Sequence, residues 1–222
     1  MAVPQNFVHA PADSNFVETS RFDVRGFRTE KGGCGFRREG VIRAGESYSE
    51  RMVAVNPATC EAVFAVGERQ RPAVLFTRPS SGQDSHTVAT PNLSNPVYGF
   101  YHTVITRDPI YLKIAELEHY LSYESGYCVD YVGSYPEVYY AEWNNWILNL
   151  LTDWNLDSCG KAYRIWHAAF SNSTFCAPFT TFVRKENEIE GHLGGYGVWR
   201  YTWSAEGGCY WLLWVHNDYW TY

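Results

Sequence analysis

Hydrophobic and polar residues alternate along much of this chain, which is the pattern of a half-buried β-strand. The stretch YRIWHAAF at residues 163–170 shows it, and GYGVWRYTW at residues 195–203 places Trp199, Tyr201 and Trp203 on one face. In EAVFAVGE at residues 61–68 both faces are apolar, which is typical of a strand buried on both sides. These stretches predict a protein built mainly from β-strands.

The stretch PFTTFVRKENEIEGH at residues 178–192 reads as a β-hairpin. A β-branched and aromatic strand comes first, and three consecutive polar residues, Lys185–Asn187, then form a charged tip before the return strand. The glycine pairs at 194–195 and 207–208 indicate tight turns or bulges.

Two other stretches are ambiguous between strand and helix. DPIYLKIAELEHYLSYE at residues 108–124 has Asp108 as a possible N-cap, Pro109 at the first helical position and a rough helical stripe of Ile and Leu. The aromatic and β-branched content of residues 136–154 favours strand. We therefore expect a mainly β fold, an antiparallel sandwich or barrel stabilised by disulfides, with at most one or two short helices.

The stretch GGCYWLLWVHNDYWTY, residues 207–222, raises the question of whether its aromatic residues form a core or a site. Alternation places Trp211, Leu213, Val215 and Tyr219 on one face, which we expect to be core. The other face mixes Trp214 and Trp220 with His216 and Asp218 and is the better place for a ligand. In the centre of a sandwich, His216 and Asp218 would instead have to satisfy each other.

The length of 222 residues fits one large or two small domains. Residues 78–96 are rich in Ser, Thr, Asn, Gly and Pro and read as a long loop or linker. This divides the chain into an N-terminal β segment (1–78), a linker (79–96) and an aromatic-rich β domain (97–222), and we expect the two β parts to pack together.

The net charge of −6 argues against a nucleic-acid partner, which would require a basic surface. From residue 89 onward, 14 Asp and Glu face 7 Lys and Arg, and all nine Trp lie in this part. This combination suits a glycan or another neutral ligand, although a cationic partner also fits. The longest apolar run, YWLLWV, is far too short for a transmembrane helix.

Six widely spaced cysteines without a CxxC pair favour three disulfides and an oxidising compartment over a metal or redox site. Buried thiols in a cytosolic protein are the alternative. We expect Cys34 to pair with Cys60, and two bridges among Cys128, Cys159, Cys176 and Cys209. The first residues show no signal peptide, and the cysteines favour a secreted protein whose leader has been replaced by an initiator Met.

The sequence contains no GxSxG, HExxH, Walker or GxGxxG motif, and nothing in it indicates a cofactor or a metal. Scattered residues could still act as acids or bases. A carboxylate beside an imidazole or an indole is the arrangement such chemistry uses, since a charge partner or desolvation shifts its pKa. The candidates of this kind are His216 with Asp218, Glu142 and Asp153. His192 is a further candidate catalytic residue, because the glycines that flank it could let a ligand approach the backbone closely.

Two further groups have more ordinary interpretations. Glu186, Glu188 and Glu190 alternate, as paired carboxylates in glycosidases can, but alternating Glu is usually the wet side of a sheet. His167 is expected to pack in the core.

The 38 Phe, Trp and Tyr residues are the strongest signal in the composition. Platforms of Trp and Tyr stack on sugar rings, yet large exposed apolar patches are avoided, so most of these rings must be core. We expect a few of them to bind a ligand, and the candidates are Trp214, Trp220, Trp199, Tyr201 and Trp203.

The second half also carries the short pieces RDP (107–109), SGYCV (125–129), FSNSTFC (170–176) and GGC (207–209). With its Trp- and Tyr-rich β pattern, this half resembles small secreted actinobacterial proteins of unknown function. The resemblance covers about 125 residues and implies a β fold with disulfides, but no activity.

The function that these observations favour is a secreted, non-enzymatic binding module with carbohydrate as the leading ligand class. A secreted hydrolase or lyase acting on glycans through scattered Glu, Asp and His is the first alternative. A membrane-acting toxin is the second, because Trp and Tyr favour lipid–water interfaces. The sequence leaves the oligomeric state open.

Overall fold

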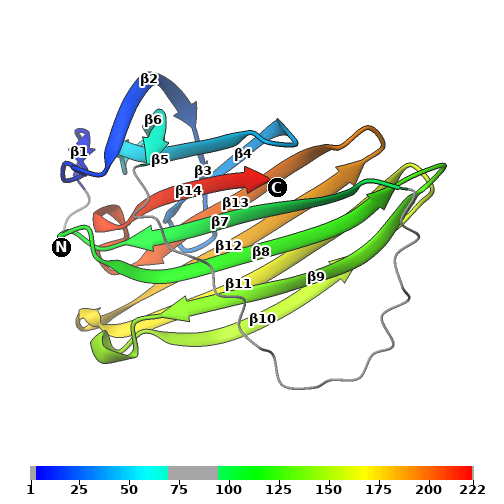
Figure 1. Ribbon diagram of the computed structural model, residues 1–222. Helices are drawn as coiled ribbons and strands as arrows, with labels where there is room; N and C mark the ends of the chain where they lie inside the picture. Colours follow the sequence, from blue (N-terminus) through cyan, green and yellow to red (C-terminus); the bar gives the residue numbers. More distant parts are fainter. Residues whose placement is uncertain (1–3, 70–94, 222) are drawn as a thin grey trace.

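The computed structural model describes residues 4–69 and 95–221 (Figure 1). Within these ranges the chain forms fourteen strands and two short 3-10 helices. The strands are β1 (Val8–His9), β2 (Phe16–Arg25), β3 (Phe27–Arg28), β4 (Cys34–Arg43), β5 (Ser47–Asn56), β6 (Glu61–Arg69), β7 (Val97–Arg107), β8 (Lys113–Ser125), β9 (Val129–Tyr140), β10 (Ile147–Asn155), β11 (Lys161–Cys176), β12 (Phe179–His192), β13 (Tyr196–Gly207) and β14 (Trp214–Thr221). The helices are η1 (Glu142–Asn144) and η2 (Tyr210–Leu212).

The strands form two antiparallel sheets that lie face to face (Figure 1). The eight-stranded sheet, which we call sheet A, has the order β2-β6-β5-β14-β7-β8-β9, and β1 also pairs with β5. The six-stranded sheet, sheet B, has the order β10-β11-β12-β13-β4-β3. The predicted fold class is confirmed: the protein is a disulfide-stabilised β-sandwich.

Strands from both predicted β parts share both sheets. In sheet B, β4 pairs with β13, and in sheet A, β5 pairs with β14. The two parts therefore complete each other's sheets rather than forming separate bodies. The expected linker at 79–96 lies outside the described residues except for its last two positions.

The six cysteines form three disulfides, Cys34–Cys60, Cys128–Cys159 and Cys176–Cys209. The expected pairing of Cys34 with Cys60 is confirmed. This bridge joins β4 of sheet B to the turn that precedes β6 of sheet A, so it ties the two sheets together.

The structure resolves one ambiguous stretch as a strand and shows that one local prediction is wrong. The stretch predicted as a possible helix after Asp108 is a short turn followed by the 13-residue strand β8, which pairs with β7 and β9 over its length. The predicted hairpin at 178–192 is the single strand β12, which runs through the expected tip at Lys185–Asn187 without turning. Pairing with strands on both sides overrides the local preference in each case.

The reason that β12 does not turn lies between the sheets. Lys185 is 2% exposed, and its Nζ donates to the backbone oxygens of Val104 and Ala115, both at 2.7 Å. Asn187 is also fully buried, and its Nδ2 donates to His102 O at 2.7 Å. Buried polar groups are tolerated where hydrogen bonds replace water, and carbonyls of β7 and β8 provide them here.

The Lys185 ammonium has no carboxylate within ion-pair distance among the described residues. Burial lowers the pKa of Lys185 well below its usual value. A neutral amine still carries two N–H groups, which matches the two carbonyls that accept from it. Lys185 and Asn187 thus connect β12 of sheet B to β7 and β8 of sheet A.

His119 of β8 is fully buried beside this group. Its Nδ1 lies 3.2 Å from Asn187 O, a carbonyl that only accepts, so this nitrogen carries the proton. Its Nε2 accepts from the Ser134 hydroxyl at 3.2 Å. Burial lowers the pKa of His119 to about 3, and burial also lowers the pKa of His102 well below its usual value.

His102 and His119 should make folding stability depend on pH. The unfolded chain binds a proton at each imidazole below about pH 6.5, while His119 in the folded protein stays neutral down to about pH 3. The unfolded state therefore binds more protons in this window, and the free energy of unfolding falls as the pH decreases, by up to about 1.4 kcal/mol per pH unit for each histidine. Urea unfolding between about pH 6.5 and pH 5 measures this slope.

His119→Asn should reduce that slope, whereas substitution of the exposed His9 by Gln should leave it as in the original protein. A urea midpoint that stays constant across the window would contradict the assignment of neutral buried imidazoles.

Candidate functional site

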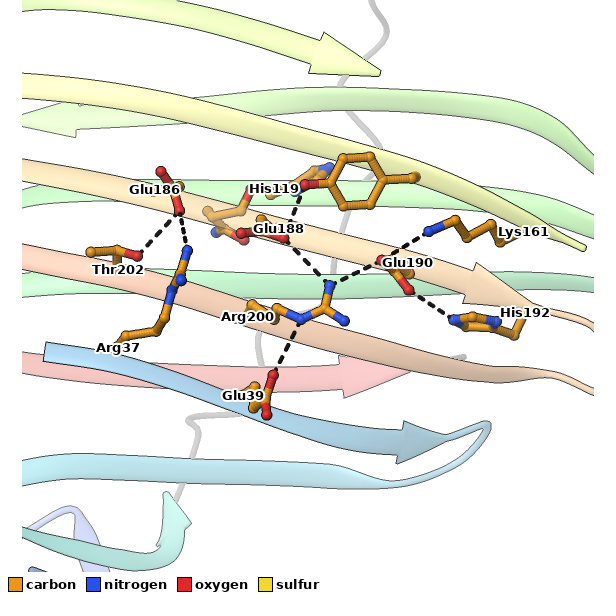
Figure 2. Close-up of polar contacts among 12 residues, drawn as sticks. Arg37, Glu39, His119, Lys161, Glu186, Glu188, Glu190, His192, Arg200 and Thr202 are labelled. Atoms are coloured by element: carbon orange, nitrogen blue, oxygen red, sulfur yellow. Dashed lines mark hydrogen bonds and ion pairs between the residues drawn. The ribbon is translucent and has the colours of Figure 1, made fainter. Parts of the chain in front are cut away.

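The outer face of sheet B, turned away from sheet A, carries an ordered set of charged and aromatic side chains (Figure 2). The central residues of this face come from β12, in which successive side chains point to opposite sides of the sheet. Lys185 and Asn187 point into the sandwich, so Glu186, Glu188 and Glu190 point outward. The expectation that these three Glu lie on the outer side of a sheet is confirmed, but Glu188 and Glu190 are only 7% and 8% exposed.

The strand register aligns this face into rows, because directly paired residues share a face. The first of three rows crosses five strands and the second crosses four. The third row also crosses four strands, and it includes the first residues of β11 and β13. The rows are Trp154–Ile165–Glu188–Arg200–Glu39, Tyr163–Glu190–Val198–Val41 and Lys161–His192–Tyr196–Arg43.

Arg200 of β13 joins the two central carboxylates (Figure 2). Its Nη1 lies 3.0 Å from Glu190 and 3.4 Å from Glu188, and its Nε lies 3.3 Å from Glu39. Lys161 and His192 reach Glu190 from the other side, at 3.2 Å and 3.1 Å. These contacts form one polar network that extends over four strands.

The network favours the ionised form of Glu190. Burial by itself would raise the pKa of Glu190, but hydrogen bonds from Arg200 and Lys161 outweigh it and hold the pKa below its usual value. Burial and a hydrogen bond to Glu188, at 2.9 Å, raise the pKa of the Tyr163 hydroxyl. A general acid needs a raised carboxyl pKa, so Glu190 does not have the property that acid catalysis requires.

Aromatic rings border the network at two places. Trp154 is 54% exposed on β10 and meets Tyr163 edge to face, with ring centroids 5.5 Å apart. On the opposite side, His192 stacks on Tyr196 with centroids 4.7 Å apart and planes 2° apart. The face therefore combines an exposed indole, a stacked ring pair and fixed hydrogen-bonding groups.

A second polar group continues the face along β12 (Figure 2). Glu186 contacts Arg37 at 3.4 Å and Thr202 at 3.2 Å. His167 Nδ1 lies 3.5 Å from the same carboxylate and its side chain is partly exposed, so the expectation of a core histidine is wrong.

The predicted ligand-binding aromatics lie elsewhere. Trp199, Tyr201 and Trp203 share a face as predicted, but that face is the core, and Trp214 is 2% exposed. Rings buried to this extent offer no surface to a ligand outside the protein, and they pack the sandwich instead. Trp220 points outward from sheet A and stacks on Tyr101, with centroids 4.9 Å apart, at the start of an aromatic row that continues through Tyr120 and Tyr135.

His216 and Asp218 contact each other, as expected for residues two apart on a buried strand. His216 Nε2 lies 3.1 Å from Asp218 Oδ1, and both residues are buried. The Ser49 hydroxyl donates to the same Asp218 oxygen. A Ser-His-Asp triad needs a bond between serine and histidine, whereas here both residues bind the aspartate.

The remaining candidate acids are at the surface. Glu142 lies in η1 and Asp153 on β10, and both side chains are exposed. Neighbouring indoles do not desolvate them, since Trp143 is 65% exposed and Trp154 points to the other face of β10 from Asp153. The structure therefore does not bring the five candidate catalytic residues together, and only His192 belongs to the network on sheet B.

A pocket of about 380 Å³ lies on the outer side of sheet A, between the N-terminal segment and strands β2, β5 and β6. Its ionisable lining includes Asp13 and Arg51, which contact each other at 3.8 Å, and Glu18, which pairs with Arg21. A hydrogen bond from Arg21 lowers the pKa of Glu18. A general acid needs a carboxyl group with a raised pKa, so the lowered pKa of Glu18 does not suit acid catalysis in this pocket.

The sequence analysis missed three of the principal residues of this face, Trp154, Tyr163 and Arg200. The sequence did contain a signal for two of them. Alternation places Arg200 and Tyr163 on the outer faces of the predicted strands 195–203 and 163–170. The pairing of those strands with β12, which brings the residues to the glutamates, is not visible in either stretch.

Comparisons with protein-family models, with curated proteins and with solved structures gave no match to this chain. Across residues 4–69 and 95–221, no helix has the length and apolar character needed to cross a membrane. In the same ranges, no group of three or more His, Cys, Asp and Glu is arranged to hold a metal ion.

The position of His192 and Tyr196 depends on a close approach between the sheets. Tyr123 of β8 packs its ring directly over Gly191, and its hydroxyl lies 3.0 Å from His192 O and 3.1 Å from Tyr196 O. A Cβ at Gly191 would overlap the ring, so Gly191→Ala should lower the free energy of unfolding by about 1–3 kcal/mol. Chemical denaturation measures the difference.

Gly160→Ala is the matched control, because a Cβ there meets no other atom within 4 Å. Equal midpoints for the two variants would contradict the proposed contact.

Proposed function

We propose that this protein is a secreted, non-enzymatic module that binds glycans on the outer face of sheet B. The ligand-contacting groups would be Trp154, Tyr163 and the His192–Tyr196 pair, with Arg200 and Lys161 between them. Sugar rings present apolar C–H faces to aromatic rings and hydroxyls to charged side chains, so a carbohydrate matches this combination.

The observation that carries the proposal is the half-exposed indole of Trp154 beside a polar network that is already paired. A paired network presents fixed donors and acceptors with little net charge, which suits a neutral ligand better than an ion. Pre-positioned groups also lose little conformational entropy when a ligand binds.

A binding role is favoured over glycan hydrolysis by the electrostatics of the same face. Glycosidases use one carboxyl group with a raised pKa and one ionised carboxylate. Here cationic groups bind Glu190 and hold its pKa low, and Arg200 bridges it to Glu188.

Secretion is supported by the three disulfides, since such bonds persist in oxidising compartments. The resemblance of the second half to secreted actinobacterial proteins points in the same direction. It adds nothing about the ligand.

Glycan-array screening followed by titration tests the proposal. Trp154→Ala should weaken binding by roughly fivefold to tenfold, because an exposed stacking partner is lost. Trp143→Ala is the matched control: Trp143 is also an exposed indole, but it lies in η1, outside this face. Its removal should leave the affinity unchanged.

Circular dichroism and the unfolding midpoint must first show that both variants are folded. Absence of binding across a broad panel of neutral and charged polysaccharides would refute the proposal, and so would equal loss of affinity in the two variants.

A further inference from the structure

The edges of the two sheets differ in how they are protected. An edge strand exposes unpaired backbone groups, and proteins guard such strands with charges, proline or shortness. In the described part of the chain, β2 carries four charged residues, β9 carries Pro136 and two acids, and β3 has only two residues. The part of β4 that β3 does not cover carries Arg37, Arg38, Glu39 and Arg43. These three edges are guarded.

Strand β10, at the other end of sheet B, is different. Its sequence ILNLLTDWN holds one charged residue, Asp153, and no proline. Leu150 is 48% exposed and Leu151 38%, and no described strand other than β11 pairs with β10. This strand therefore combines an open backbone edge with exposed apolar side chains.

We propose that β10 is a homodimer interface, in which β10 of a second copy pairs with it antiparallel and extends sheet B across both molecules. Two identical strands meet naturally about a two-fold axis, which makes the contact self-complementary. The bulge at Asn149 interrupts the regular strand, so the pairing uses residues 150–154.

The sequence of β10 selects one register. A two-fold axis perpendicular to the sheet keeps each side chain on its own face, so opposed residues must have the same parity. Centring the axis on Thr152 places Leu150 opposite Trp154 of the second copy, on the outer face, and opposes the two Thr152 residues. Asp153 then faces Leu151.

The two neighbouring registers would be less stable than the one centred on Thr152. An axis at Asp153 would oppose two carboxylates, which is destabilising. An axis at Leu151 would bring the segment before the bulge into the contact, where Leu148 and Trp154 lie on different faces.

The dimer would place the two sheet B outer faces side by side in one surface, with six strands from each copy. Each Trp154 would stay on that surface beside Leu150 of the other copy. A glycan chain could then contact both copies, although the dimer itself does not depend on the proposed glycan binding.

A cysteine crosslink tests the register. Opposed residues in an antiparallel pair have Cα atoms about 4.5–5.5 Å apart, within the range that a disulfide spans. Under mild oxidation, Thr152→Cys should give a covalent dimer linked through the introduced thiols, identified by mass spectrometry. Ser20→Cys on the guarded edge strand β2 is the matched control and should stay monomeric.

Sedimentation velocity tests the interface without crosslinking. Thr152→Lys opposes two ammonium groups at the axis and should weaken dimerisation by at least about tenfold, whereas Thr152→Val keeps a neutral β-branched residue and should preserve it. A concentration-independent monomer, or equal crosslinking of Thr152→Cys and Ser20→Cys, would overturn the proposal. A Thr152→Lys monomer that still binds glycan would separate the two functions.

Discussion

Hydrogen bonds between polar side chains and backbone across the space between the sheets are the interaction on which the rest of this structure depends. Lys185 and Asn187 of β12 donate to carbonyls of β7 and β8, and His119 returns a contact to the backbone of β12. Unlike apolar contacts, such bonds are directional, so they fix how the two sheets slide and rotate against each other. The same strand displays the glutamates on its other side.

The β class, the shared face of Trp199, Tyr201 and Trp203, and the Cys34–Cys60 bridge could be predicted from the sequence. Alternation is a local property, so it assigns residues to a common face without any knowledge of the rest of the fold. The continuous strand β12 could not be predicted, because three polar residues in succession signal a turn unless acceptors are supplied from elsewhere. Those acceptors lie about 70–85 residues away in the chain.

The candidate site was only partly predictable, for a related reason. The alternation of residues along β12 placed Glu188 correctly on an outer face. Which side chains reach Glu188 depends instead on how β11 and β13 pair with β12, and this pairing brings Tyr163 and Arg200 to it. The abundance of tryptophan led to the opposite error, in which buried rings were predicted to bind a ligand. A run such as Trp199 to Trp203 looks like a ligand platform and is core, while Trp154 is exposed because β10 lies at an edge.

Strand β14 has a consequence for how the chain acquires this structure. It lies between β5 and β7, so residues 214–221 join the first three long strands of sheet A to the last three. Until these residues pair with β5 and β7, the larger sheet is two unconnected parts with open edges. Closing loops of this length is slow, and exposed edges attract other chains meanwhile. The larger sheet is therefore completed only when strand β14 is in place, and protection of the open edges until then matters as much as the speed of collapse.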